Sequence, residues 1–178
     1  YLQRGPRGTP ARLGLAVPPS WTADFWKGRI AVSLLVLTDG ETLLPEAVPP
    51  RTVLTLSPED DTLLSVLEDI CEGPPRSRFE VTPADFLNIL DVSFHTRLVV
   101  AGKEELTVEK IPMQTSLRIE LDHETGELII FPCTELPFLQ PGEIPVYLVN
   151  NRHGRVLANG HIWPMKNVLP VPYHGIYR

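Results

Sequence analysis

Histidine, lysine and cysteine are the residue types here that could carry chemistry, so their spacing comes first. The histidines form no HxxxH pair on a helix, and they have no carboxylates at metal-ligand spacing. Only His123 and Glu124 are adjacent, in a polar loop, which favours solvated turn histidines over a metal centre. The five histidines are His95, His123, His153, His161 and His174.

A nucleotide site is not indicated. Gly102-Lys103-Glu104 has the lysine of a phosphate loop but lacks the upstream glycine and the Ser or Thr that would hold magnesium. There is no GxSxG elbow for nucleophilic catalysis. Cys71 and Cys133 lie far apart in apolar stretches, which is typical of reduced, buried thiols. No catalytic, cofactor-binding or metal-binding residue is predicted.

Carboxylates could perform acid–base chemistry, but spacing alone nominates no pair. Glu59, Asp60 and Asp61 fit the positive end of a helix dipole, and Glu104-Glu105 fits a solvated turn. A small hydrolase stays open as an interpretation, if histidines and carboxylates converge in three dimensions. The histidines in question are His95, His161 and His174.

A basic run near the N-terminus contains Arg4, Arg7 and Arg12 among glycines and prolines. It is either a flexible, phosphate-contacting arm or a solvated turn. The formal net charge of −6 opposes nucleic-acid binding, because that affinity comes from Lys and Arg releasing counterions. Weak or no direct nucleic-acid binding is predicted.

Three aromatic residues, Trp21, Phe25 and Trp26, follow the break at Pro18-Pro19-Ser20, in a stretch expected to be a loop. They could form a binding surface. Because each ring buries a large apolar area, anchoring in the core is the favoured interpretation.

The elements that position these residues must be short, because nineteen prolines are spread along the chain. A length of 178 residues suits a single domain over 1–178 or two lobes over 1–75 and 76–178. The start at Tyr1, without a methionine, suggests a fragment of a longer polypeptide, although processing could leave the same start. No apolar run of membrane-spanning length is present, so no membrane contact and a cytoplasmic location are expected.

Two helices are predicted by their start signals, Ser57-Pro58 and Thr82-Pro83, in which a hydroxyl caps free amides and proline suits the first turn. Gly73-Pro74-Pro75 ends the first helix. The apolar stripes at helical spacing are Leu63, Leu64, Leu67, Ile70 and Cys71 in the first, and Phe86, Ile89, Leu90 and Phe94 in the second.

Alternating or continuous apolar runs predict the strands. The run 30–37 is nearly all apolar, so both its faces are expected to be covered. The tail from His161 is expected to be irregular chain, because prolines interrupt it. A brief extended link is expected at 79–81. The other strands are predicted at 13–17, 52–56, 98–101, 106–111, 146–149 and 155–157.

The clearest pattern is a hairpin over 116–131, in which Gly126 takes positive φ to close a type I turn. A lone hairpin is only marginally stable in water, so its apolar face needs a partner. The fold class expected is α+β: antiparallel β meanders and hairpins with two short helices packed on one face.

The segment FLNILDVSFHTRLVVAGKEELTVEKIPMQTSLRIELDHETGELII, residues 86–130, resembles the region upstream of the motor in bacterial Swi/Snf-type ATPases of the helicase superfamily. That region has a helix and a strand, a short "gk.l.v" hairpin, a proline, and then a strand pair. The stretches RLGLAV…WKGRIAVSLLVLTDG and VYLVNNRHGRVL…LP also fit this layout.

The resemblance implies a parent protein that couples ATP hydrolysis to translocation on double-stranded DNA through two RecA-like lobes. Neither a GxGKT phosphate loop nor a DExH box occurs in this chain, so ATP and Mg²⁺ would bind outside it. The chain would be a non-catalytic accessory or regulatory domain whose partner is the motor in cis or another protein. The alternative is a free-standing adaptor that meets proteins through a strand edge or its proline-rich tail.

Overall fold

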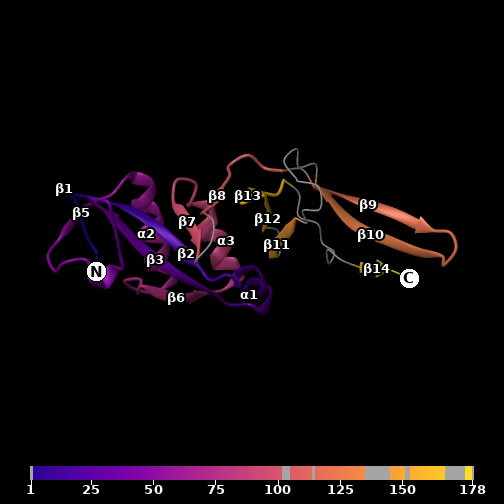
Figure 1. The fold of residues 1–178 in the computed structure, drawn as a ribbon, viewed down its shortest axis with the longest axis horizontal. Coiled ribbons are helices and arrows are strands. Elements are labelled where there is room, and N and C mark those ends of the chain that lie inside the picture. Colours follow the sequence, from indigo (N-terminus) through magenta and orange to yellow (C-terminus); the bar gives the residue numbers. More distant parts are fainter. Residues whose placement is uncertain are drawn as a thin grey trace. The chain divides into compact units, whose positions relative to one another are not determined.

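A computed structural model describes residues 2–101, 105–113, 115–134, 145–150, 153–166 and 175–177 of the chain. The chain divides into an N-terminal unit, Tyr1–Val108, and a C-terminal unit, Glu109–Arg178. The α+β class is confirmed, because the described residues form helices and mostly antiparallel sheets (Figure 1).

The N-terminal unit is built on one mixed sheet, with strand order β8-β7-β2-β3-β4 and β6 also paired with β3. The β2–β7 pair is parallel, and the other pairs are antiparallel. The break suggested after residue 75 falls inside this unit, because β6 pairs with β3. The strands are β2 (Arg12–Val17), β3 (Ile30–Thr38), β4 (Glu41–Leu43), β6 (Arg78–Val81), β7 (Arg97–Val100) and β8 (Glu105–Val108).

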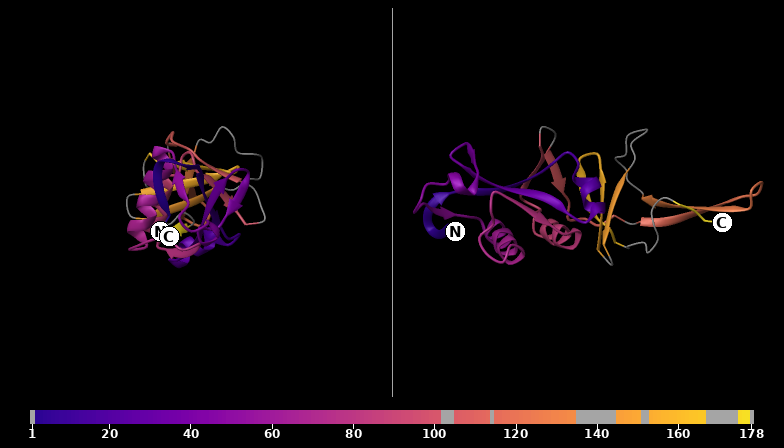
Figure 2. Two further views of the ribbon diagram at one scale, coloured as in Figure 1. Left: turned by 90° about the vertical axis from the view of Figure 1, so that its left-hand side faces the viewer. Right: turned by 90° about the horizontal axis from the view of Figure 1, so that it is seen from below.

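Helices α2 (Pro58–Ile70) and α3 (Pro83–Asp91) lie side by side on one face of this sheet, as predicted (Figure 2). Each begins with the expected cap: the Ser57 hydroxyl accepts from the Asp60 N–H at 3.1 Å, and the Thr82 hydroxyl from the Asp85 N–H at 3.2 Å. Their apolar stripes form the core. The buried helix residues are Leu63, Leu64, Leu67, Phe86, Leu87, Ile89 and Leu90.

A third helix, α1 (Trp21–Lys27), corrects the expectation of a loop after the Pro18-Pro19 break. Trp21 and Phe25 are one helical turn apart, so both rings turn to the same side and pack on Phe86 of α3, with centroids 5.7 and 6.5 Å away. Tertiary burial of these two rings stabilises a helix of seven residues, which is too short to form alone. A short 3-10 helix, η1 (Pro45–Ala47), follows β4.

Strand β3 also differs from its prediction, since only one of its faces is fully buried. The strand alternates between buried and half-buried residues, as expected for a sheet with helices on one side. The buried residues are Ile30, Val32, Leu34 and Val36, and the half-buried ones are Ala31, Ser33, Leu35 and Leu37.

The basic run near the N-terminus is a strand, β1 (Gln3–Pro10), and neither a flexible arm nor a simple turn. It pairs in parallel with β5 (Val53–Thr55). Arg4 and Thr9 both take Leu54 as their partner, so the residues between them loop out of the ladder. The interruption is a bulge in a parallel pair, which no hydrophobic pattern would reveal.

Thr55 holds this bulge closed. Its hydroxyl donates to the Gly5 carbonyl at 2.7 Å and accepts from the Gly8 N–H at 2.8 Å. A Cβ on Gly8 would stand 2.1 Å from the carbonyl oxygen of Val53, so only glycine permits this approach.

In the C-terminal unit, β11 (Val146–Asn150), β12 (His153–Ala158) and β13 (His161–Pro164) form an antiparallel meander. Strand β13 corrects the expectation of an irregular tail: Pro164 is tolerated because it is the strand's last residue. A second small core forms here. It contains Tyr147, Val156 and Met165, with Met113, Val149 and Trp163 packed against them.

The predicted hairpin forms strands β9 (Thr115–Asp122) and β10 (Glu127–Thr134), drawn in Figure 1 as two long arrows joined by one turn. Strand β14 (Gly175–Tyr177) pairs with the other side of β10, so this part of the tail is also a strand. Gly126 has a φ of +71°, which confirms its predicted conformation, and its N–H donates to the Asp122 carbonyl at 2.8 Å.

Replacing Gly126 with valine is expected to destabilise the hairpin by about 1–2 kcal/mol, because a β-branched residue is forced to positive φ. Amide hydrogen exchange in β9 and β10 measures this loss directly. Gly126→Asn is the matched control, since asparagine tolerates the left-handed region and should have a smaller effect. Unchanged exchange in the valine variant would contradict the assigned turn.

Candidate binding surface

One histidine gains a carboxylate partner that its sequence neighbours did not reveal. His161 Nδ1 lies 2.8 Å from Glu109 Oε1, and the His161 ring lies 5.7 Å from that of Trp163. The Glu109 N–H donates to the Ile162 carbonyl at 2.8 Å, so backbone pairing sets this contact. Since 52 residues separate the pair, no local pattern could have found it.

The other candidate groups do not join this pair. His95 is exposed and its carbonyl accepts from Arg12 Nη2 at 2.9 Å, while His123 and His153 are exposed. His174 and the loop Gly102-Lys103-Glu104 lie outside the described residues, as does the side chain of Cys133. Cys71 is a partly buried free thiol whose pKa is raised by burial. No group of His, Cys, Asp and Glu side chains within the described ranges could hold a metal ion.

Three carboxylates in the part of the chain that the structure describes have shifted pKa values, and each has a structural task. Asp60 is 3% exposed; its Oδ2 accepts from the Leu13 N–H of β2 at 3.2 Å, and burial raises its pKa. Glu46 accepts from the Ser77 N–H at 2.9 Å, which lowers its pKa. The N–H groups of Glu124 and Thr125 lower the pKa of Asp122 in the hairpin turn. The pKa shifts therefore arise from burial for Asp60 and from backbone hydrogen bonds for Glu46 and Asp122.

The arginines of the basic run are also used within the fold. Arg4 forms ion pairs with Asp61 and Glu68 of α2, both at 2.9 Å. Arg12 bonds the carbonyl of His95. Two of the three arginines, Arg4 and Arg12, therefore have partners within the fold.

The aromatic cluster separates into core and surface. Trp21 and Phe25 are buried, as the core interpretation expected, whereas Trp26 is 58% exposed. The expectation was wrong for Trp26, because most of its surface remains in solvent. Its ring contacts Phe25 edge-on at 5.5 Å.

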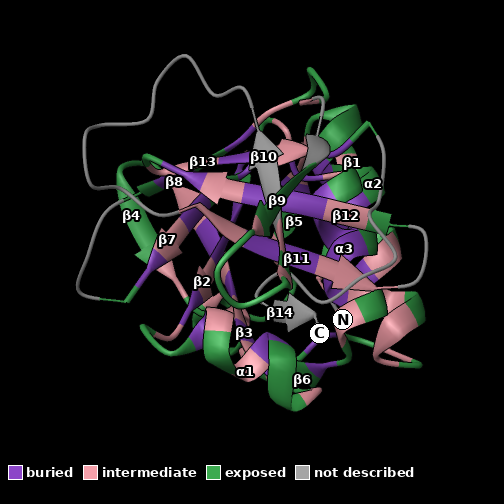
Figure 3. Cartoon of the chain, turned by 90° about the vertical axis from the view of Figure 1, so that its right-hand side faces the viewer, coloured by how far each residue is buried: buried purple, intermediate pink, exposed green. Residues whose placement is uncertain are grey.

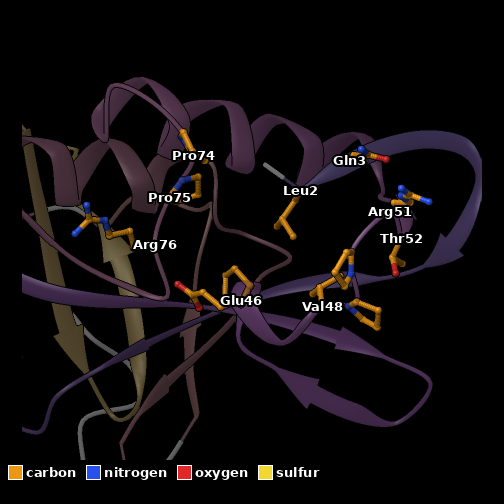
Figure 4. Close-up of a pocket in the computed structure, with 12 residues that line it drawn as sticks. Leu2, Gln3, Glu46, Val48, Arg51, Thr52, Pro74, Pro75 and Arg76 are labelled. Atoms are coloured by element: carbon orange, nitrogen blue, oxygen red, sulfur yellow. The ribbon is translucent and has the colours of Figure 1, made fainter.

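Among the cavities lined by described residues, two open on the N-terminal unit, and neither of these two gathers a converging set of functional groups. The first, of about 280 Å³, is lined by prolines, with Arg51 and Arg76 at opposite sides and pointing away from each other (Figure 4). The second, of about 300 Å³, has Arg97 in its wall, but Glu105 lies 3.4 Å away and offsets its charge.

The hairpin presents an apolar face to solvent. Cross-strand pairing sets Ile119 opposite Ile130 and Leu121 opposite Leu128, so these four share one face. The exposed fractions are 60% for Ile119, 49% for Leu121 and 43% for Leu128, and exposed residues are green in Figure 3. Three large apolar side chains exposed side by side are typical of an interaction surface. We call these four residues the hairpin face.

No family model matches the chain, and neither a curated protein nor a solved structure matches it. Among the described residues, no helix has the length and apolar character needed to cross a membrane.

Proposed function

We propose that this chain is a non-catalytic accessory module that binds another protein through the hairpin face. The observation that carries the proposal is the exposure of Ile119, Leu121 and Leu128 together on one side of a sheet. Removing these exposed apolar side chains from water lowers the free energy, so a partner that covers them forms a more stable complex. The net charge of −6 favours a protein over nucleic acid as that partner.

The partner that we propose is the ATPase motor of a Swi/Snf-type DNA translocase, in cis and in the cytoplasm. The order of elements supports it: α3 is followed by β7, β8, Pro112 and the β9–β10 pair, which is the layout of the region that residues 86–130 resemble. ATP and Mg²⁺ would belong to the motor and not to this chain. The module would restrain or activate the motor by contact.

The first test is the full-length sequence downstream of Arg178, where a phosphate loop is expected. The second is the DNA-stimulated ATPase rate of the protein that carries this segment, with residues 1–178 present or deleted. Deletion is expected to change the rate. Identical rates and identical DNA affinity would overturn a regulatory role.

A double substitution isolates the hairpin face in the same assay. Leu121→Glu with Leu128→Lys makes the face polar and introduces a cross-strand ion pair between the two positions, so the hairpin is expected to retain its pairing. The double variant is expected to change the ATPase rate in the direction of the deletion. Glu124→Lys, at the tip of the same hairpin, is the control and should leave the rate unchanged. A double variant that behaves like the wild type would show that the face does not contact the motor.

A full-length protein without a motor would favour the free-standing adaptor instead. One side of β9 has no strand partner among the described residues, and this supports that alternative, because an edge strand can accept an extended peptide from a partner. Binding of such a partner would then depend on β9 and occur without ATP or DNA.

A further inference from the structure

Strand β9 has an edge that lacks a described partner. In the sheet order β14-β10-β9, it pairs with β10 on one side only, as far as the described residues show. Every second residue of such a strand directs its N–H and C=O groups away from its neighbour. The strand is eight residues long and contains no proline, whose missing N–H would interrupt pairing at an edge. Its edge is therefore ready to accept another strand.

The sequence of β9 is self-complementary about Ile119. Arg118 precedes Ile119 and Glu120 follows it, and leucines stand at 117 and 121. If two copies of β9 lie antiparallel with Ile119 opposite Ile119, Arg118 of each copy is directly opposite Glu120 of the other. Directly opposite residues in an antiparallel pair share a face and interact most strongly.

We propose that β9 pairs antiparallel with β9 of a second copy of this chain, in the register centred on Ile119. Each of the two neighbouring two-fold registers has a like-charge contact at its centre. Centring on Arg118 sets that arginine opposite itself. Centring on Glu120 sets Arg118 opposite Asp122 but also sets Glu120 opposite itself, and like charges directly opposite are destabilising. Only the Ile119 register among these three has opposite charges at both flanking positions and no like-charge contact.

This pairing also accounts for the exposed hairpin. The two three-stranded sheets join into one sheet in which the hairpin faces of both copies lie on the same side. Ile119 gains the second copy's Ile119 as a neighbour, which covers part of the most exposed residue of the hairpin face. A larger sheet is also more stable than two narrow ones. The inference does not rest on the proposed function, since it needs no motor.

The test is sedimentation velocity of the 178-residue chain over a concentration series. The wild type is expected to dimerise. Arg118→Glu and Glu120→Arg should each weaken self-association by about tenfold or more, because each sets like charges opposite one another at two places. Glu124→Arg, which makes the same charge change at the turn, is the matched control and should dimerise like the wild type.

Mixing the two variants makes the test specific. In an equimolar mixture, the Arg118→Glu chain has glutamate at positions 118 and 120, and the Glu120→Arg chain has arginine at both. Opposite charges then face one another between the two β9 strands, so the mixture is expected to form a heterodimer. The mixture cannot restore the ion pair that Arg118 and Glu120 make within one chain, so that contact cannot explain a rescue. A monomeric wild type, single variants that dimerise normally, or a mixture that stays monomeric would each overturn the proposal.

Discussion

Replacing Phe86 with alanine is expected to lower the free energy of unfolding by about 3–5 kcal/mol, the largest effect of any substitution considered for this chain. Phe86 is 1% exposed. Its ring contacts Trp21 and Phe25 of α1 while its backbone belongs to α3. The loss combines the transfer of the ring out of the core, the cavity left behind and the two aromatic contacts.

Urea unfolding followed by circular dichroism measures this loss, and Trp26→Ala is the matched control. Trp26 also belongs to α1 but is 58% exposed, so its replacement should cost less than about 1 kcal/mol. The Phe86 variant should in addition loosen α1, since that helix depends on its rings being buried. Equal destabilisation by the two substitutions would contradict the arrangement of this core.

Replacing Asp60 with alanine is expected to have the second largest effect, about 1–3 kcal/mol, because the N–H of Leu13 then loses its buried acceptor. Asp60→Asn keeps an oxygen at this position and should cost much less. Asp69→Asn, on an exposed position of α2, controls for the loss of a negative charge from the helix. Similar losses for the alanine and asparagine variants would contradict the assigned hydrogen bond.

The asparagine variant also reveals a pH dependence. Burial raises the pKa of Asp60 in the folded state, so the folded chain binds this proton more readily than the unfolded chain does. The contribution of Asp60 to stability is therefore greatest below its unfolded pKa and is lost as the pH rises through its folded pKa. Asp60→Asn lacks this contribution, so its stability relative to the wild type should rise over that pH window.

The difference in stability between the wild type and Asp60→Asn reports on Asp60 alone, because all other titrating groups are present in both proteins. Glu46 and Asp122 have lowered pKa values and act in the opposite direction, but they contribute equally to wild type and variant. Unfolding free energies measured at several pH values give the difference. A difference that stays constant from acid to neutral pH would contradict the raised pKa of Asp60.

Local patterns predicted the elements whose stability comes from nearby residues. Ser57 and Thr82 mark the first turns of α2 and α3 because a cap bonds an amide three residues away. Gly126 closes the hairpin because positive φ is a property of one residue and its immediate turn. Strands with strict alternation, such as β9, were predicted for the same reason, since the side-chain period is two.

The elements and contacts that local patterns do not predict depend on residues that are far apart in the sequence. Helix α1 exists because Phe86, about sixty residues later in the chain, covers its rings. The local pattern around β1 predicts an arm or a turn, because its parallel partner β5 and the ion pairs of Arg4 with α2 come from elsewhere in the sequence. The contact of His161 with Glu109 arose in the same way.

The sequence of this protein by itself determined its α+β class, the caps of its two longer helices and the turn of its hairpin, because these depend on residues within one or two turns. Only the tertiary structure decided which apolar residues remain in water. Leu67 and Leu121 are the same residue type in equally clear patterns, yet one is fully buried and the other half exposed. Burial depends on what the rest of the chain covers, and that difference marks the hairpin face as the candidate binding surface.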